Sequence, residues 1–335
     1  MDRKKLVISL VTYNGAAYLP ACLDSISRQT LHDIEVVVLD NASSDGTVAV
    51  VRELAPHVRV IVLSENTGFS RGHNAVIRDT VSEYVLVLNQ DVVLGSDYCE
   101  RLVTFLDKNL EYSSTTGLLT SGSQEDLTKG VFGDTVDSAG IAVGFAQRPA
   151  NIGAVKLVSN AGASREVWGV SAAAALYRRS ALEDVAITID RGNVEYFDED
   201  FFMYHDDSDL SYRLRWRGWR AWCEISARAV HIRTRRDGAG EFFKRSSVQI
   251  NYWSYRNRWW FIAKNVSGGV FIRSGIAIAL FEIAKFGYLV LFERATLRAL
   301  IDVKKGWARM MSKRSMIMKG RTISDAEMIK TFSLR

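Results

Sequence analysis

Residues 84–91 read YVLVLNQD, an apolar run that ends on two side-chain amides and a carboxylate. Such a run is typical of a strand that is buried on both faces of a sheet. Similar runs precede it at 6–11, 34–39 and 58–63, and stretches with helical spacing separate them. The pattern predicts the order βαβαβαβ, one half of an open, mostly parallel α/β sheet of Rossmann-like type.

Polar residues follow each of these predicted strands. Right-handed crossovers place the strands side by side, so their carboxyl ends meet at one edge, where ligands bind in this architecture. The residues expected there are Thr12, Tyr13, Asn14, Gly15, Asp40, Asn41, Glu65, Asn66, Asn89, Gln90 and Asp91. After the first strand only Gly15 is present in place of a GxGxxG loop, and no GxxxxGKS/T loop occurs anywhere. These absences argue against an NAD-binding enzyme and a P-loop ATPase.

Length and composition suit a globular protein. With 335 residues, 47% of them hydrophobic, the chain can form one large α/β domain with a C-terminal elaboration, or two modest domains. Its three cysteines, Cys22, Cys99 and Cys223, are far apart and form no CxxC pair, which argues against a disulfide framework and a zinc site. The first apolar run lacks a small-residue cleavage site, so we expect no export signal and a cytoplasmic protein.

The middle and the end of the chain are less regular. Residues 110–164 are rich in Ser, Thr and Gly, which predicts loops around a binding cleft. Residues 209–216 read as a helix closed by Gly218. The segment 270–292 is nearly apolar but interrupted by charges, so we expect an interfacial helix or a helix packed on the protein rather than a membrane span. Residues 303–321 hold seven Lys or Arg and no Asp or Glu; anionic lipid, nucleic acid or solvent alone are the alternatives.

Several residues are candidates for chemistry. Asp91 follows a strand, and Mg²⁺ or Mn²⁺ commonly needs only one or two carboxylates when phosphates supply further oxygens; a turn aspartate is the alternative. Crowded acidic residues at 195–209 favour a general base, or else a helix cap with salt bridges. His231, which follows a predicted strand, is a candidate metal ligand or a structural histidine, and the basic stretch 233–240 suits a diphosphate clamp.

The motifs occur in an order that resembles glycosyltransferase family 2, especially its bacterial rhamnosyltransferase-like branch with the GT-A fold. They are TYNG (12–15), CLDSISRQT (22–30), LDNASSDGT (39–47), ENTGFSRGHN (65–74), LNQD (88–91), FDEDFFMYHDDSDLSYRLRWRGW (197–219), AVH (229–231) and YRNRWW (255–260). The resemblance implies a GT-A catalytic domain over 1–264, with a nucleotide-sugar-binding half at 1–109 and an acceptor half at 110–264. A helical, basic extension then covers 265–335.

The resemblance also implies roles for single residues. The nucleotide-sugar site would comprise Thr12, Tyr13, Asn14, Asp40, Asn66, Arg71, Asn74, Asn89 and Gln90. Asp91, with His231, would hold Mn²⁺ or Mg²⁺, and Asp207 would be the catalytic base, with Asp206 as second choice. Trp168 and Asp209 would lie near the acceptor. The chain departs from the usual pattern at Asn89, Gln90, Asp206 and Ala172.

The activity implied is inverting transfer of a sugar from a dTDP- or UDP-linked donor, rhamnose first, to a hydroxyl of a polysaccharide or lipid-linked glycan. The enzyme would be peripheral on the cytoplasmic face of the membrane, where an anionic surface is an expected partner. A non-catalytic nucleotide-sugar or glycan-binding protein is the alternative, and the retained carboxylates Asp91 and Asp207 argue against it. Nucleic acid is not an expected partner, because the basic aromatic stretch 255–260 also suits an amphipathic helix.

Overall fold

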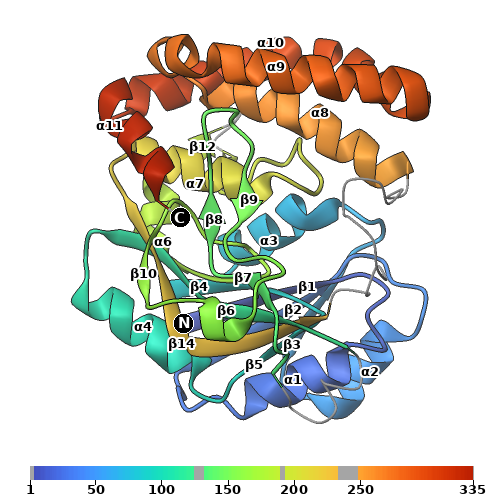
Figure 1. Ribbon diagram of the computed structural model, residues 1–335. Helices are drawn as coiled ribbons and strands as arrows, with labels where there is room; N and C mark the ends of the chain where they lie inside the picture. The colour runs from blue at the N-terminus through green and yellow to red at the C-terminus, as the bar shows by residue number, and fades with distance from the viewer. Residues whose placement is uncertain (1–3, 124–131, 189–192, 233–247, 335) are drawn as a thin grey trace.

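The computed structural model describes residues 4–123, 132–188, 193–232 and 248–334 (Figure 1). Its centre is a mixed sheet in which the main strands follow the order β10-β14-β6-β11-β4-β1-β2-β3, with β5 beside β14 and β7 beside β6. These strands are β1 (Lys4–Thr12), β2 (Ile34–Asp40), β3 (Arg59–Val62), β4 (Ser82–Asn89), β5 (Val92–Leu94), β6 (Tyr112–Gly122), β7 (Val136–Ser138), β10 (Arg165–Val167), β11 (Ala174–Arg178) and β14 (Arg220–Ile232). Two small ribbons pair β8 (Ile141–Ala142) with β9 (Ala150–Asn151) and β12 (Ile187–Thr188) with β13 (Val194–Glu195).

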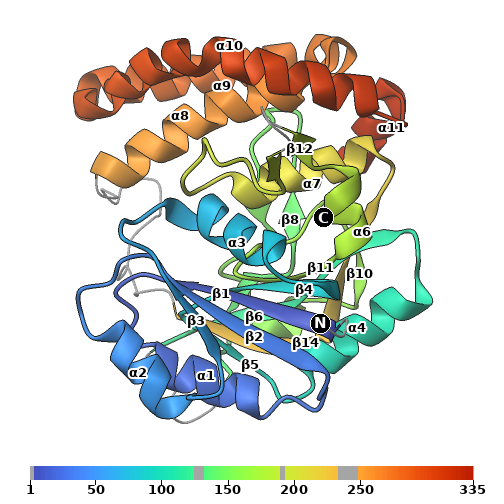
Figure 2. The same cartoon turned by 180° about the vertical axis from the view of Figure 1, so that it is seen from behind.

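The N-terminal half has the predicted alternation of strands and helices. β1 pairs in parallel with β2 and β4, and β2 with β3. Helices α1 (Leu19–Ser27), α2 (Thr47–Leu54) and α4 (Tyr98–Lys108) cover one face, and α3 (Gly68–Arg78), α6 (Arg179–Asp184) and α7 (Asp206–Trp216) cover the other (Figure 2). The four predicted strands are confirmed. The apolar side chains of β1, β2 and β4 are buried on both faces of the sheet, whereas those of the edge strand β3 are only partly buried or exposed.

The prediction of loops over 110–164 is wrong for its first part, since β6 is a buried strand between β14 and β11. Its small polar residues fit the interior because neighbouring carbonyls accept their hydroxyl protons. Ser113 donates to the carbonyl of Arg220 and Thr116 to that of Ala174, each at 3.1 Å. A Cβ at Gly117 would collide with the carbonyl of Ala227, so this position excludes a side chain. The strand is therefore invisible to a search for apolar runs.

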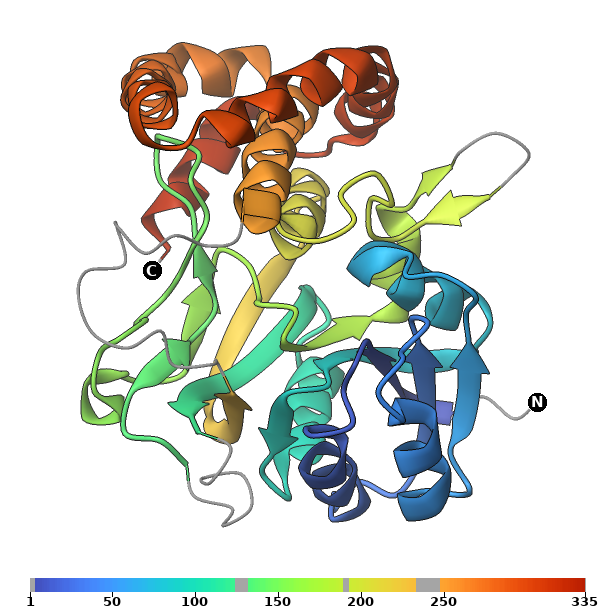
Figure 3. The same ribbon diagram turned by 90° about the vertical axis from the view of Figure 1, so that its right-hand side faces the viewer.

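The C-terminal helices form a layer on the far side of α7, opposite α1 and α2 (Figure 3). They are α8 (Val248–Asn265), α9 (Gly268–Phe292), α10 (Ala299–Gly320) and α11 (Asp325–Lys330), with short 3₁₀ turns η1 (Val158–Asn160), η3 (Arg294–Arg298) and η4 (Thr331–Ser333) in the chain. One core cluster joins Trp168 and Trp216 of the α/β part to Trp260, Met310 and Met328 of these helices. The predicted C-terminal helical region is confirmed, and the boundary proposed at 264/265 falls in the last turn of α8.

Candidate active site

The carboxyl ends of β1, β2 and β4 meet at one edge of the sheet. Thr12 is paired in register with Asp40, and Val11 with Asn89. In an open α/β sheet this edge is where ligands bind. The polar segments that the sequence places after these strands therefore come together in space.

Gln90 joins two of these segments through its side chain. Its Oε1 accepts hydrogen bonds from the Thr12 hydroxyl at 2.5 Å and from the backbone N–H of Tyr13 at 2.9 Å. Its Nε2 donates to the carbonyl of Tyr13 at 3.1 Å. A Cβ at Gly15 would overlap the Gln90 and Thr12 side chains, which explains why glycine stands there. Gln90 thus holds the loop after β1 in place through both the oxygen and the nitrogen of its side-chain amide.

The predicted nucleotide residues of β1 and β2 also shape turns. Asp40 accepts hydrogen bonds from the N–H of Ser43 at 3.0 Å and from its hydroxyl at 2.5 Å. Asn14 accepts one from the N–H of Ser44 at 2.9 Å, which ties the two turns together. The Tyr13 side chain remains about half exposed at the edge, with 48% of its surface accessible. Tyr13 is therefore an aromatic ring open to a ligand beside a preformed polar rim.

Asp91, His231 and Asp137 form a line of hydrogen-bonding groups just beyond β4. The Nε2 of His231 lies 3.5 Å from Oδ1 of Asp91, and its Nδ1 lies 2.9 Å from Oδ2 of Asp137. Burial lowers the pKa of His231, but the two carboxylates outweigh that effect and raise its pKa to about 9. Sequence reasoning missed Asp137, because it lies in the stretch without clear periodicity.

The line of groups suits a divalent cation. With a carboxylate at each nitrogen and a raised pKa, His231 carries a proton on both nitrogens when no cation is present. A cation bound at Nε2 would displace that proton while Asp137 still holds Nδ1–H, an arrangement common around metal-bound histidine. Within the described residues no cluster of three or more His, Cys, Asp or Glu could hold a metal alone. Asp91 and His231 therefore fit an ion that takes its remaining oxygens from a diphosphate and water. The predicted diphosphate clamp at 233–240 lies outside the described residues.

Two neighbouring carboxylates begin α7, and they differ in surroundings. Asp206 is buried and accepts a hydrogen bond from the Ser70 hydroxyl of α3 at 2.5 Å. Burial raises the pKa of Asp206 to about 7, against the opposing effect of that hydroxyl. Asp207 is only partly buried and accepts hydrogen bonds from the N–H groups of Ser208 at 2.6 Å and Ala172 at 3.4 Å. Burial also raises the pKa of Asp207.

Asp207 lies at the same edge of the sheet as Asp91. The backbone N–H of Ala172 donates to Asp207, and the carbonyl of the next residue, Ala173, accepts from the N–H of Asn89 at 2.9 Å. Asn89 is two residues before Asp91 on the same strand end. The structure thus brings together the predicted base and the predicted metal carboxylate, although they are far apart in sequence.

The predicted sugar-binding residues near α3 separate into two kinds. Asn74 is fully buried, and its amide donates to the carbonyl of Phe197 at 2.7 Å and accepts from its N–H at 2.9 Å. This side chain therefore docks α3 on the 196–199 segment and does not face the edge. Asn66 accepts from the N–H of Gly68 at 2.9 Å in the turn before α3. Arg71 is 55% exposed, with its Nε 3.4 Å from Glu199, so its guanidinium can reach a ligand.

The two predicted acceptor residues are not open to a ligand. Trp168 is fully buried in the core that joins α7 to the C-terminal helices. Asp209 is also fully buried and lies among three partners, at 3.0 Å from Nε of Arg213 and at 2.7 Å from both Lys264 and Asn265. Because both side chains are fully buried, neither can contact an acceptor directly, and the prediction is wrong on this point. Trp168 packs in the core, and Asp209 pairs with buried cations.

Comparisons with known proteins concern the family and the fold of the chain. The family model described as Glycosyl transferase family 2 matches residues 7–186. The chain is 26% identical over 302 residues to the N-acetylglucosaminyl-diphospho-decaprenol L-rhamnosyltransferase of Mycobacterium tuberculosis (strain ATCC 25618 / H37Rv), a match that covers 82% of this chain and 92% of that protein. It is 31% identical over 112 residues to the glycosyltransferase GlyA of Streptococcus pneumoniae serotype 4, where the match covers 33% of this chain and only 16% of GlyA.

Among solved structures, the chain resembles the crystal structure of S. aureus TarS 1-349, with a TM-score of 0.56 and 14% identity over 98% of this chain and 89% of that one. It also resembles GalNAc-T7 solved with UDP, GalNAc and Mn²⁺, with a TM-score of 0.55 and 12% identity over 78% of this chain and 50% of that one. At these identities the likenesses concern the fold, which is the GT-A fold with a C-terminal helical region. With the family model matching more than half of its residues, the chain belongs to glycosyl transferase family 2.

Proposed function

We propose that the protein is an inverting glycosyltransferase in which Asp207 is the general base and Asp91, with His231, holds a divalent cation. The observation that carries this proposal is the position of Asp207. It is the partly accessible member of the α7 carboxylate pair, its pKa is raised, and it lies at the sheet edge that also bears Asp91.

The chemistry follows from these positions. Asp207 takes the proton of an acceptor hydroxyl while the hydroxyl oxygen forms a bond to the anomeric carbon of the donor. The bond from that carbon to the nucleotide diphosphate breaks on the opposite face, so the anomeric configuration is inverted. A base works best with a pKa closer to neutrality than that of an ordinary aspartate, and burial provides this shift. A cation held by Asp91 and His231 would stabilise the charge that develops on the leaving diphosphate.

The same edge is suited to the nucleotide. Tyr13 offers an exposed ring on which a nucleobase can stack, and Asp40 and Asn14 hold the neighbouring turns in place. Arg71, which is more than half exposed, is suited to the diphosphate or the sugar. Asn66, Asn74, Asn89 and Gln90 act by holding these segments in place.

We propose dTDP-rhamnose as the donor and a lipid-linked glycan or polysaccharide as the acceptor. The mycobacterial relative, whose name states rhamnosyl transfer to a decaprenol-linked sugar, supports this assignment. A UDP-sugar is the alternative donor, since TarS, which shares the fold, has been solved with UDP. A lipid-linked acceptor would place the enzyme peripherally on the cytoplasmic face of the membrane.

A non-catalytic glycan-binding or nucleotide-sugar-binding protein of this fold is a less suitable reading. Binding alone would not need a partly exposed carboxylate with a raised pKa beside the cation position.

Calorimetric titration with dTDP-rhamnose, UDP-glucose and UDP-galactose, each with and without Mn²⁺, tests the donor and the metal together. We expect tight binding of dTDP-rhamnose that weakens when Mn²⁺ is removed. Metal-independent binding would contradict the role of Asp91 and His231. Preference for a UDP-sugar would show that the donor is a UDP-sugar and not dTDP-rhamnose. Failure to bind any of the three would contradict the proposed donor class.

A further inference from the structure

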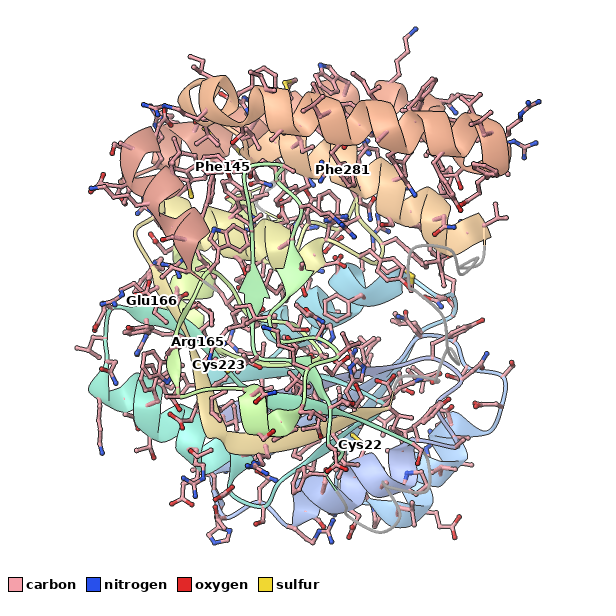
Figure 4. The ribbon with its side chains drawn as sticks, in the orientation of Figure 1. Cys22, Phe145, Arg165, Glu166, Cys223 and Phe281 are labelled. Atoms are coloured by element: carbon pink, nitrogen blue, oxygen red, sulfur yellow. The ribbon has the colours of Figure 1, made fainter. Side chains whose placement is uncertain are left out.

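Helix α9 turns two of its polar side chains, Ser274 and Glu282, toward the protein. Glu282 is buried and accepts a hydrogen bond from Nε of Arg258 on α8 at 2.5 Å. Ser274, also buried, lies 3.3 Å from the amide of Gln147. Phe281 and Phe145, both labelled in Figure 4, lie where the segment between β8 and β9 reaches the C-terminal helices. This inward face is held by specific contacts, so the orientation of the helix is fixed.

The opposite face of α9 is apolar and open. Ile272, Ile276, Leu280, Ile283 and Leu291 are 82%, 80%, 64%, 70% and 70% exposed. These positions fall within one side of an α-helix and extend for about 28 Å along its axis. We name this surface the α9 stripe. Of the 18-residue window that makes α9 most apolar, only 17% is buried within the protein.

This distribution is the reverse of that in a helix of a water-soluble surface, which turns its apolar side to the core and its charged side to solvent. An apolar stripe of this length marks an interaction site. From it we infer that the α9 stripe lies on the surface of an anionic phospholipid membrane, with the helix parallel to the membrane plane. The inference needs neither the donor nor the acceptor of the proposed reaction.

The charges around the stripe favour lipid over a second copy of the chain. Over 268–321, all of which the structure describes, the exposed charged side chains are Arg273, Arg294, Arg298, Lys304, Lys305, Arg309, Lys319 and Arg321. The three acidic residues in this range, Glu282, Glu293 and Asp302, are not exposed. Two such faces would repel each other, whereas anionic headgroups would attract both. Apolar burial of the stripe and electrostatic attraction by these side chains would therefore both favour contact with anionic lipid.

The stripe is a more important contact than the basic segment 303–321. Two of that segment's seven basic side chains are used within the protein: Lys313 is buried against Asp198, and Arg314 donates to the carbonyls of Ala263 at 2.8 Å and Val266 at 2.6 Å. The remaining basic side chains of the segment are exposed and would add electrostatic attraction to anionic lipid.

Contact from the side suits α9 better than insertion across the bilayer. By length and composition α9 is the one described helix that could span a membrane. Spanning would, however, break the Arg258–Glu282 ion pair and place Glu282 and Lys285 in hydrocarbon, at a cost of several kcal/mol. In-plane contact leaves these groups on the protein side.

Sedimentation of the full-length protein with vesicles tests the inference. We expect binding to mixed phosphatidylglycerol and phosphatidylcholine vesicles, and binding at least about tenfold weaker for the Ile276→Asp, Ile283→Asp double variant. Leu110→Asp with Val155→Asp is the matched control, since these residues are 70% and 77% exposed elsewhere on the surface. Thermal unfolding checks that each variant is folded.

A depth measurement then tests the orientation without loss of the stripe. The native cysteines are buried, so a fluorophore on Ile276→Cys can be attached selectively. We expect quenching by shallow lipid-borne quenchers, whereas quenching from the bilayer centre would show a spanning helix and overturn the in-plane arrangement. Unchanged vesicle binding by the double variant would contradict the inference that the α9 stripe contacts the membrane. So would a wild-type protein that ignores vesicles but forms a dimer that the double variant lacks.

Discussion

At the start of α7, two adjacent aspartates have different surroundings because distant parts of the chain contact them. Asp206 is buried and bonded to Ser70 of α3, while Asp207 remains partly accessible beside Ala172. The sequence could predict the pair from the acidic cluster, but not which member faces solvent. That choice depends on α3 and on the approach to β11, which are distant in the chain.

Replacement of Asp207 tests its proposed role as the base. We expect Asp207→Asn to lower the transfer rate by about 10²–10⁴-fold, since an amide cannot take the acceptor proton. Donor affinity, measured by calorimetry, should be unchanged. Asp206→Asn is the control and should keep much more activity, because it retains the shape of the Ser70 contact. Loss of transfer in Asp206→Asn alone would exchange the roles of the two residues.

The Asp206 carboxyl should also make stability depend on pH. Its pKa is about 7 in the folded protein against 3.8 ordinarily, so the folded state binds the proton more tightly. Its contribution to stability is full below pH 3.8 and is lost as pH rises through about 7, by up to about 4 kcal/mol. Urea unfolding at pH 5 and pH 8 should therefore show a smaller difference in the free energy of unfolding for Asp206→Asn than for wild type. An equal difference in both proteins would contradict the shift.

Asp137 should act on the cation through His231. We expect Asp137→Asn to weaken Mn²⁺ binding in the presence of nucleotide by about 10–100-fold, because the imidazole loses the partner that orients it. Electron paramagnetic resonance of free Mn²⁺ measures this without catalysis. Asp134→Asn, an exposed aspartate three residues earlier, is the matched control. Equal affinity in the two variants would remove Asp137 from the site.

Strands with apolar sequences could be predicted, whereas a buried strand with many polar residues could not. β1, β2 and β4 stand out in the sequence because their side chains are mostly apolar and buried, and β3 because its sequence is apolar although it lies at the edge of the sheet. β6 does not stand out, because it holds Ser113 and Thr116, whose hydroxyls bond to neighbouring strands. The link between α8 and the base was also invisible, since it consists of side-chain bonds to backbone carbonyls. The family match ends at residue 186, before both α7 and α8.

Helix α8 holds the turn that precedes Asp206 and Asp207. Phe202, Tyr204 and His205 all have positive φ, at 64°, 68° and 68°, which is an unfavourable backbone conformation for residues other than glycine. Asn257 is fully buried, and its Nδ2 donates to the carbonyls of Phe201, Met203 and Tyr204 at 2.8, 2.7 and 3.0 Å. One amide therefore stabilises the turn that leads into α7.

Asn257 should accordingly be a positioning residue. We expect Asn257→Asp to lower kcat by at least about tenfold with little change in the donor KM, because a carboxylate of the same shape repels the three carbonyls and shifts Asp207. Steady-state kinetics separate the two constants. Asn251→Ala on the same helix is the control, since Asn251 contacts Glu293 away from the turn. A parallel loss of kcat and stability in both variants would show a merely structural role.

At the scale of the whole molecule, the C-terminal helices are joined to the catalytic part by buried charges as well as by a shared core. Lys313 of α10 lies 2.7 Å from Glu195, 2.5 Å from Asp198 and 2.9 Å from Asp200. Lys264 of α8 also pairs with Asp198. Burial alone would raise the pKa of Asp198, but the two lysines hold it well below its ordinary value. The acidic cluster that the sequence linked to catalysis is thus partly an interface between α10 and the catalytic part.

Lys313→Met should show that the two parts unfold together. Removing one partner of a buried ion pair leaves carboxylates uncompensated, so we expect a loss of about 3–5 kcal/mol of stability, against little change for the exposed Lys319→Met on the same helix. The contribution of Asp198 is present above its ordinary pKa of 3.8 and is lost as pH falls below it, so the gap between wild type and Lys313→Met should narrow in acid. Calorimetry should give one transition that moves as a whole, because α10 and α7 share a core. A separate early transition in Lys313→Met, with the catalytic part unaffected, would instead show that the C-terminal helices unfold independently.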